Sequence, residues 1–452
     1  MKGQALTDAY RLLDASLIHY QGRPVGTAAA IDPAGLAADN YRECFIRDFA
    51  VSGLVFLADG KWEIVRDFLL TSLEVTEREH SAPEQTIHNS VMPASFHVRR
   101  EQDGKEYLRG DFGEQAIGRV APVDSIMWWT LLLCATMQTI GDRGLAERPD
   151  VQRNLRRVLA LCANDSFEVY PTLMVPDGAF MVDRRMGVYG HPLEIQVLFF
   201  GALRRALHYI DRSPENRRLI AVGEHRLRGL RQYVQHYYWL DLQRLNELYR
   251  SPTEELGESV SNDLNIQPQS IRDWVADWLP DESGYLVGNL GSGRMDFRFF
   301  TQGNLLAVVF GLVTDRQARG IMNLIERRWD DLVGTMPVKL CYPALTGEAW
   351  DLLTGCDPKN RPWSYHNGGN WPVLLWPLVA ASLSTGRRDL AERAFALAVE
   401  RLPRDGWPEY YDGTSGRLLG RYANLQQTWS AAALILADKL LEDPGLLALL
   451  PE

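Results

Sequence analysis

The sequence contains few cysteines, no long apolar run and no excess of basic residues, and each absence excludes a class of protein. Its five cysteines in 452 residues are widely spaced and form no Cys-x-x-Cys pair, which favours reduced thiols over a disulfide framework or a zinc site. No apolar stretch reaches membrane-spanning length, and the first residues contain no apolar signal segment, so we expect a cytoplasmic protein without a membrane partner. The formal net charge of −10 argues against nucleic acid as a partner.

Motifs for nucleotide and metal chemistry are also missing. The chain has no HExxH and no GxxxxGK[ST], and the glycines of residues 110–118 lack the strand–turn–helix context of a dinucleotide site. We therefore expect no metal and no cofactor. The 13 tryptophans offer broad faces that suit both a large core and the rings of a neutral sugar.

The most unusual segment is residues 175–196, where ionisable side chains crowd a short loop that leads directly into an apolar helix. They are Asp177, Asp183, Arg184, Arg185, His191 and Glu194. Ordinary ion pairs that cap a buried helix would gather the same residue types. The segment alone therefore does not distinguish a functional site from a charged helix cap.

Six segments share one pattern, in which polar residues at the first turn are followed by side chains that are apolar on nearly all sides. This pattern is typical of buried helices. The segments begin near Arg47, Asp124, His191, Gln302, His366 and Asn424. Ordinary N-caps would explain Asp124 and Asn424, but they do not explain Arg47 or His191.

Amphipathic, charge-rich segments alternate with the buried ones. They lie near residues 5–20, 62–79, 150–163, 215–240, 316–332 and 387–402. The alternation predicts an all-α fold, an (α/α)6 barrel with six inner and six outer helices, as a single domain over residues 1–452. All polar first turns would then face one rim, where a concave site is expected.

One connection, at about residues 250–302, is longer than most connections in compact domains. It precedes the fourth inner helix, and its glycine-rich part, residues 288–293, predicts a loop or a short strand. We interpret it as an insertion that forms a wall or a partner surface, which leaves room for a homo-oligomer.

Two carboxylates are placed to face each other across the predicted ring. Asp183 precedes the third inner helix, and Glu409 lies in an aromatic turn before the sixth. Opposed carboxylates suit glycoside hydrolysis, in which one protonates the leaving oxygen and the other activates water or attacks the anomeric carbon. Taken by itself, Glu409 is better explained as a turn residue in water.

Several long motifs closely resemble the alkaline/neutral invertase family. They include Met295-Asp-Phe-Arg-Phe-Phe300 and Trp407-Pro-Glu-Tyr-Tyr-Asp-Gly413, together with residues 40–49, 111–129, 182–187, 190–196 and 362–372. The resemblance runs in order from about residue 40 to residue 430. It implies an (α/α)6 barrel that hydrolyses sucrose to glucose and fructose with inversion, in the cytoplasm and without a metal.

The resemblance also implies roles for single residues. Asp183 matches the general acid and Glu409 the residue that activates water. The positions expected to line the sugar subsites are Arg47, Asp48, Asp124, His191, Glu194, Gln196, Tyr365, His366, Asn367 and Gln427. Trp363 and Trp429 could stack on a sugar ring or pack, whereas Trp371 is expected to pack inside a buried helix.

A general acid must keep its proton near neutral pH, yet Arg184 and Arg185 directly follow Asp183 and would favour its charged form. We expect both arginines to point away into ion pairs. Glu194 or another carboxylate, with partial burial, would then keep Asp183 protonated. For inversion the two carboxyl groups should lie roughly 6.5–9.5 Å apart.

Two other classes of function fit the same features. A disaccharide phosphorylase or a sugar epimerase could use this barrel, since fold does not fix function. Phosphate-dependent cleavage or an isomerised product would identify them. A non-catalytic sugar-binding protein would instead show affinity without turnover.

Overall fold

The computed structural model describes residues 1–31, 39–79, 92–102, 104–113, 122–163, 170–175, 180–250, 262–419 and 423–450. Three features of the sequence fall partly or wholly outside these ranges. They are Asp177, the centre of the motif at residues 111–129, and residues 251–261 of the expected insertion.

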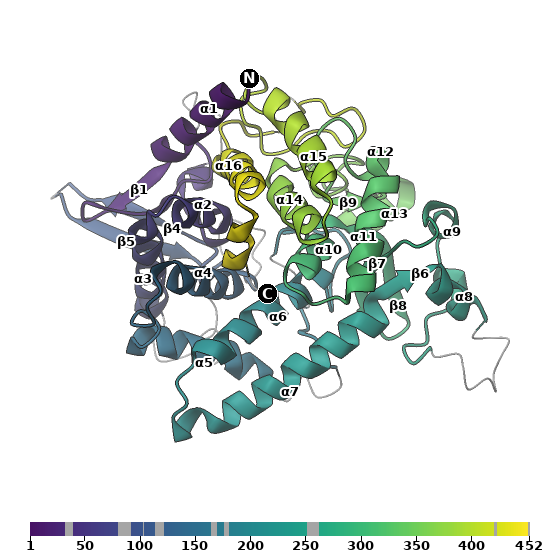
Figure 1. Cartoon of the computed structure of the whole chain (residues 1–452), viewed down its shortest axis with the longest axis horizontal. Coiled ribbons are helices and arrows are strands. Elements are labelled where there is room, and N and C mark those ends of the chain that lie inside the picture. Colours follow the sequence, from purple (N-terminus) through teal and green to yellow (C-terminus); the bar gives the residue numbers. More distant parts are fainter. Residues whose placement is uncertain are drawn as a thin grey trace.

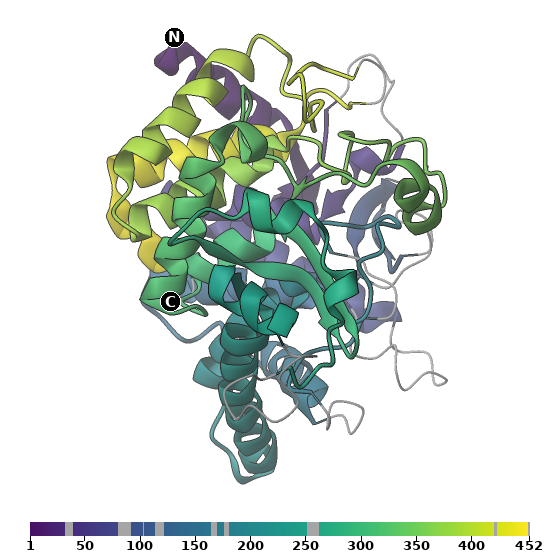
Figure 2. The same ribbon diagram turned by 90° about the vertical axis from the view of Figure 1, so that its right-hand side faces the viewer.

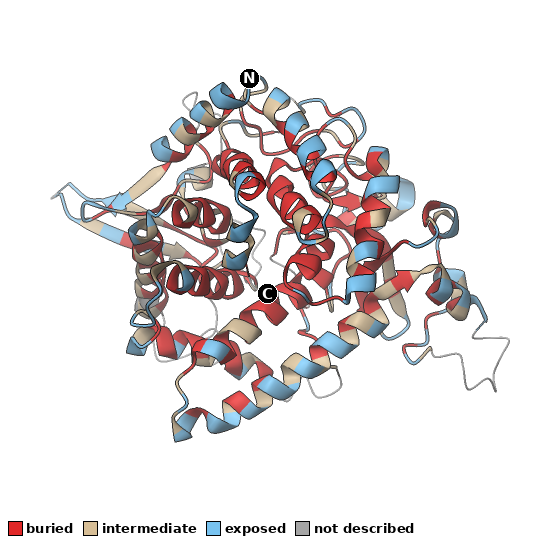
Figure 3. Ribbon diagram, in the orientation of Figure 1, coloured by how far each residue is buried: buried red, intermediate tan, exposed pale blue. Residues whose placement is uncertain are grey.

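Buried helices form a closed ring at the centre of the molecule (Figure 1). In chain order they are α2 (Ile46–Ala58), α4 (Ser125–Ile140), α6 (Leu193–Tyr209), α10 (Thr301–Val309), α14 (Leu375–Ser384) and α16 (Thr428–Glu442). Each packs against the next, and α16 packs against α2. Figure 3 shows these helices buried along most of their length, as expected of segments without a polar face.

Glycines allow the helices of the ring to approach closely. A Cβ atom at Gly53 of α2 would lie 2.9 Å from Leu132 of α4. A Cβ atom at Gly201 of α6 would lie 3.0 Å from the ring of Phe310, at the end of α10. Larger side chains at these positions would push neighbouring helices apart.

Amphipathic helices surround the ring. They are α1 (Lys2–Ala15), α3 (Trp62–Glu79), α5 (Pro149–Cys162), α7 (Arg217–Tyr233), α11 (Asp315–Arg327) and α15 (Arg388–Arg401). Their apolar faces pack inward, as Val151, Leu155 and Leu159 of α5 do. Figure 2 shows α7 projecting from the body of the molecule. None of the helices in the described ranges is long and apolar enough to cross a membrane.

Two inner helices begin later than the sequence predicts. The segment from His366 forms a loop instead, in which Asn370 pairs with Tyr411, and Pro372 opens a 3-10 turn before α14. Trp371 is buried as expected, but it lies ahead of the helix rather than inside it. Asn424 likewise precedes α16, because residues 424–427 pair with neighbouring loops.

The all-α class is not confirmed, because the described residues include three small antiparallel sheets. They consist of β1 (Leu17–Tyr20) and β2 (Arg23–Thr27); β3 (Cys44–Phe45), β4 (Ser95–Arg100) and β5 (Glu106–Asp111); and β6 (Trp239–Asp241), β7 (Gly284–Gly291), β8 (Arg294–Phe300) and β9 (Cys341–Tyr342). Residues 17–20, predicted as the end of a helix, form β1. The glycine-rich segment at 288–293 belongs to the β7–β8 hairpin, whose two-residue turn contains Gly293 at φ +66°.

The two ends of the ring differ. The chain's last 3-10 turn, η9 (Pro444–Leu449), packs on α4, α14 and α16, and Arg205 near the end of α6 donates a hydrogen bond to Leu450 O at 3.0 Å. The polar first turns of the inner helices lie at the opposite end. A site for a polar ligand is therefore expected there.

Closure of the ring predicts a difference between two chemically identical substitutions. Leu132 is 2% exposed and faces Gly53, whereas Leu352 is 70% exposed. We expect Leu132→Ala to lower the free energy of unfolding by about 2–5 kcal/mol and Leu352→Ala to change it by less than about 0.5 kcal/mol. Urea unfolding followed by circular dichroism measures both, and equal effects would contradict the packing described.

Candidate active site

Ionisable side chains gather at the first-turn end of the ring. Arg47 and Asp48 come from α2, Asp124 precedes α4, Glu194 lies in the first turn of α6, and loops supply Asp183, Lys359 and Glu409. Their charges affect one another's proton affinities, so they form one electrostatic unit. The described residues contain no group of three His, Cys, Asp or Glu side chains placed to hold a metal ion.

A buried ion pair joins the first two inner helices. Arg47 Nε lies 2.5 Å from Asp124 Oδ2, and Nη2 lies 3.2 Å from Oδ1, with 11% and 0% of the two side chains exposed. Asp124 stands at the N-cap of α4, but its side chain makes no capping hydrogen bond. The interpretation of Asp124 as an ordinary cap is therefore wrong, because both carboxylate oxygens bind Arg47.

Asp183 is placed to hold a proton. Burial raises the pKa of its carboxyl group to about 6, against the attraction of Arg47, Lys359 and Arg184 and with help from Glu409. Its side chain keeps 17% of its surface exposed. The group is thus partly accessible while its neutral form is favoured.

Arg184 forms an ion pair, as expected: its guanidinium group lies 2.8 Å from Asp357 Oδ2. Its charge nevertheless lowers the pKa of Asp183. Arg185 has no ion pair among the described residues. Glu409 is a neighbouring carboxylate that raises the pKa of Asp183.

Glu409 has a different environment. Tyr41 Oη donates a hydrogen bond to Oε1 at 2.9 Å, Asn424 Nδ2 donates to Oε2 at 3.1 Å, and Lys359 Nζ lies 4.0 Å from Oε2. These groups all suit a charged carboxylate. Glu409 is only 3% exposed, so it is not a turn residue in water.

An aromatic wall lies beside the two carboxyl groups. The rings of Tyr365 and His366 stack at 4.0 Å, and Lys359 Nζ lies 3.9 Å from the centre of the Tyr365 ring. His366 Nδ1 is 3.6 Å from Asp183 Oδ1. Burial, with Lys359, Arg184 and Arg47 nearby, lowers the pKa of His366 well below its usual value, which favours a neutral imidazole.

Glu194 supports the loop that carries Asp183. Its Oε1 accepts hydrogen bonds from Met181 N and from Gln302 Nε2, both at 3.1 Å. Burial raises the pKa of Glu194 to about 8, and burial together with neighbouring carboxylates raises that of Asp48 to about 8. The clustered carboxyl groups therefore do not all carry charge at neutral pH.

Some predicted subsite residues use their polar atoms within the protein. Gln196 exchanges hydrogen bonds with the main chain of Leu173, and Asn367 does so with that of Leu345. His191 Nδ1 lies 2.8 Å from Thr172 Oγ1. These three residues hold loops in place, and their contact with substrate stays a prediction.

Trp363 lines a neighbouring cavity. This cavity has a volume of about 760 Å³, and its walls include Trp274, Trp278 and Tyr342. Trp363 also adopts φ +65°, a left-handed conformation that tryptophan rarely takes. These observations do not bear on sugar stacking, so that role of Trp363 stays a prediction.

Other predicted residues have polar atoms without partners. Both amide atoms of Gln427, Nε1 of Trp429 and Nδ1 of His366 are buried, and none forms a hydrogen bond within the part of the chain that the structure describes. Buried polar atoms in proteins are normally paired. Because solvent does not reach these atoms, their contact with a ligand stays a prediction.

Three residues of the site were missing from the predicted set. Tyr41 and Asn424 hold Glu409, and Lys359 lies near both carboxyl groups. Tyr41 belongs to the motif at residues 40–49, so that motif could have indicated it. Lys359 lies just ahead of the motif at residues 362–372, among several other charged residues, and nothing in the sequence distinguishes it from them.

Comparison with known proteins places the chain among invertases. The pattern of the family described as alkaline and neutral invertase matches residues 9–444. The chain is 48% identical over 440 residues to a protein named probable alkaline/neutral invertase F from Arabidopsis thaliana, with 97% of this chain and 88% of that protein covered. It is 48% identical over 444 residues to cytosolic invertase 1 from Oryza sativa subsp. japonica, covering 98% and 79% of the two chains.

Solved structures support the fold. A wild-type glycosidase aligns with a TM-score of 0.57 over 99% of this chain and 97% of its own, at 15% sequence identity. A rhamnosidase from Klebsiella oxytoca, solved with rhamnose bound, aligns with a TM-score of 0.54 over 96% and 63% of the two chains, at 14% identity. At such identities the likeness concerns the fold alone, a helical barrel of the kind seen in glycosidases.

The raised pKa of Glu194 predicts how stability depends on pH. Because the folded state holds this proton up to about pH 8 and the unfolded state releases it near pH 4.5, its contribution to stability is present at low pH and is lost as pH rises between these values. We expect Glu194→Gln, which does not titrate, to lose less stability than wild type between about pH 5 and about pH 8. Urea unfolding at both pH values measures this, and identical losses would contradict it.

Proposed function

Because this chain belongs to the alkaline and neutral invertase family, we propose that it hydrolyses sucrose to glucose and fructose with inversion. Asp183 is the general acid, and Glu409 activates the attacking water. The observation that carries this assignment is the contrast between two neighbouring carboxyl groups. Burial favours the protonated form of Asp183, whereas two donors and a cation surround Glu409.

At the leaving-group side of the single displacement, Asp183 donates its proton to the oxygen that links glucose and fructose, so that fructose departs as a neutral alcohol. The neutral His366 imidazole, 3.6 Å from Asp183, contributes no charge that would remove this proton early. The negative charge of Glu409 also opposes early ionisation of Asp183.

In the same step, Glu409 accepts a proton from a water molecule as that water attacks the anomeric carbon from the opposite face of the ring. Tyr41 and Asn424 fix both carboxylate oxygens, which orients the base. Two carboxyl groups on opposite sides of the sugar, separated by a water, give inversion.

The remaining cluster supplies the sugar subsite. Arg47, whose side chain is 11% exposed and paired with Asp124, supplies a cation to this subsite beside Asp48. We assign Tyr365, which lies against His366 and Lys359, to this subsite together with Trp429 and Gln427. We interpret the ring of inner helices with its outer layer as an (α/α)6 barrel whose first-turn rim forms this subsite.

We also propose that the protein acts in the cytoplasm. All five cysteines are free thiols, four of them buried, which suits a reducing compartment. Relatives carry names of more than one kind, since one rice relative is called cytosolic and another mitochondrial.

The acid and base assignment predicts the effect of two isosteric substitutions. Asp183→Asn removes the donated proton and Glu409→Gln removes the base, so each should lower the rate of glucose and fructose release from sucrose by about 100-fold or more. Assays in phosphate-free buffer, with circular dichroism to confirm folding, test this. Release that requires phosphate would indicate a phosphorylase, and unchanged rates in folded variants would remove these two roles.

The charges around Asp183 predict opposite shifts in the pH profile. Arg184 lowers the pKa of Asp183, and Asp357 partly neutralises Arg184. Arg184→Gln should therefore raise the pKa of Asp183 and move the alkaline limb of kcat/KM to higher pH, because the acid stays protonated longer. Asp357→Asn should move the same limb to lower pH. Shifts in the same direction would contradict the assignment of Asp183 as the acid.

A further inference from the structure

The loop that carries Asp183 has little regular structure of its own. Its described backbone pairs only where Gly190 bonds with Val175 and where Pro192 meets Asn289. The Asp183 carboxyl group has no hydrogen bond among the described residues, and Nδ1 of the neutral His366 lies 3.6 Å from its Oδ1. The position of this carboxyl group therefore depends on whatever holds the main chain of the loop.

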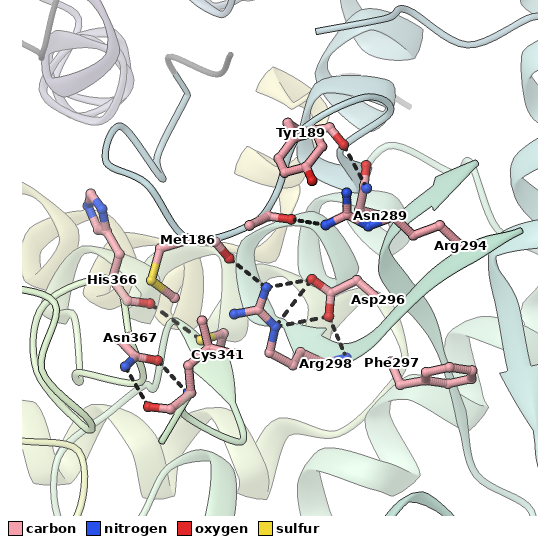
Figure 4. A network of polar contacts seen from close by, with 12 residues as sticks. Met186, Tyr189, Asn289, Arg294, Asp296, Phe297, Arg298, Cys341, His366 and Asn367 are labelled. Carbon is pink, nitrogen blue, oxygen red and sulfur yellow. Dashed lines mark hydrogen bonds and ion pairs between the residues drawn. The ribbon is translucent and has the colours of Figure 1, made fainter. Parts of the chain in front are cut away.

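The β7–β8 hairpin holds that main chain at consecutive points (Figure 4). Arg298 Nη2 donates to Met186 O at 2.8 Å, and Arg294 Nη2 donates to Gly187 O at 2.7 Å. Asn289 bridges two further groups, donating to Tyr189 O at 2.8 Å and accepting from His191 N at 2.9 Å. The first of these contacts lies only three residues beyond Asp183.

Asp296 fixes the arginine that makes this first contact. Its carboxylate accepts hydrogen bonds from Arg298 Nε at 2.9 Å and Nη2 at 2.6 Å, and from the Arg298 main-chain N at 3.1 Å. Only 8% and 11% of the two side chains are exposed. Such a bidentate pair leaves the guanidinium group one orientation, with Nη2 aimed at Met186 O.

Stability alone does not account for a charged pair at this place. Desolvation offsets much of the attraction within a buried ion pair, and apolar side chains of similar volume often serve stability as well. Arg298 Nη1 is also buried without a partner in the described structure. A buried pair that still leaves a donor unpaired is better explained by the position it enforces.

The neighbouring strand fixes the other side of the acid. β9 pairs with β8 through Cys341 and Phe300, and Cys341 Sγ donates to His366 O at 3.3 Å. Adjacent strands of one sheet, β8 and β9, therefore hold the loop of Asp183 and the main chain of His366. Figure 4 shows the two attachments side by side.

We propose that Asp296 and Arg298 form a positioning pair for the general acid, which sets the Asp183 carboxyl group against His366 and the scissile oxygen. This inference rests on the proposed function. Neither side chain touches the reacting atoms. Asp296 orients Arg298, and Arg298 acts through the Met186 carbonyl group. The pair also keeps the loop closed, which preserves the burial that maintains the proton on Asp183.

Arg298→Met and Asp296→Asn test the proposal through kcat, KM and the pH profile on sucrose. We expect kcat to fall about tenfold or more, because the acid is displaced, with KM changed by less than about threefold. The alkaline limb of the kcat profile should move to lower pH, since water that enters the loosened loop lowers the pKa of Asp183. Arg298→Lys, which retains the charge and one donor nitrogen, should recover part of the lost kcat and part of the shift in the alkaline limb.

Asp59→Asn provides the control. Asp59 pairs with Lys439 at 2.5 Å at the end of α2 farthest from the site, so this variant also loses an ion pair but should keep the wild-type kcat and pH profile. If the Arg298→Met and Asp296→Asn proteins fold and keep the wild-type kcat and alkaline limb, the positioning role is overturned. The same conclusion follows if Asp59→Asn shows equal changes.

Hydrogen exchange separates this inference from the proposed function. In Arg298→Met, amides of residues 186–191 should exchange about tenfold faster or more, while those of α4 and α16 keep wild-type rates. A wild type without activity on sucrose would refute the proposed function but leave this measurement intact. Unchanged exchange in this segment would refute the pair as a positioning device even if sucrose is hydrolysed.

Discussion

The structure depends on an electrostatic constraint, because several carboxyl groups share a largely buried space with few cations. Arg47 is committed to Asp124 by two contacts, and Lys359 lies 4.0 Å from Glu409. The other carboxyl groups cannot all ionise at low cost in such a place. Burial accordingly raises the pKa of Asp183 to about 6 and those of Asp48 and Glu194 to about 8.

This constraint is useful for acid/base chemistry, because it places the two carboxyl groups that the proposed reaction needs in different environments. Asp183 lacks hydrogen-bond donors in the described structure and favours its proton, whereas Glu409 is held by Tyr41 and Asn424. The ring of helices makes the arrangement possible, since each helix begins at the same end and brings its first turn to one place. The sheet at β7–β9 then fixes the loops that the helices leave free.

Periodicity identified the helices well, because side chains apolar on all sides distinguish α4 or α16 from an amphipathic helix such as α5. It missed the strands other than the one allowed for at residues 288–293, since elements of two to eight residues leave little pattern. It also misplaced the starts of α14 and α16, where loop pairing such as Asn370 with Tyr411 replaces helical hydrogen bonds. Those pairings join residues far apart in the chain.

The sequence likewise predicted some features of the site and missed others. Motifs pointed to Asp183, Glu409 and the Arg47 region, and the structure brings these together. They could not show that Gln196 and Asn367 would use their amides on main-chain groups, or that Lys359 would lie beside Tyr365. Such outcomes depend on distances between loops, which no single segment encodes.

The most direct test of the account is the anomeric form of the glucose first released from sucrose, followed by proton NMR before mutarotation. Sucrose contains an α-linked glucosyl group. Water activated by Glu409 and a proton from Asp183 would invert that carbon, so β-glucose should appear first and equilibrate slowly to the mixture. Initial α-glucose would contradict single-step inversion at the glucosyl carbon and with it the proposed roles of the two carboxyl groups.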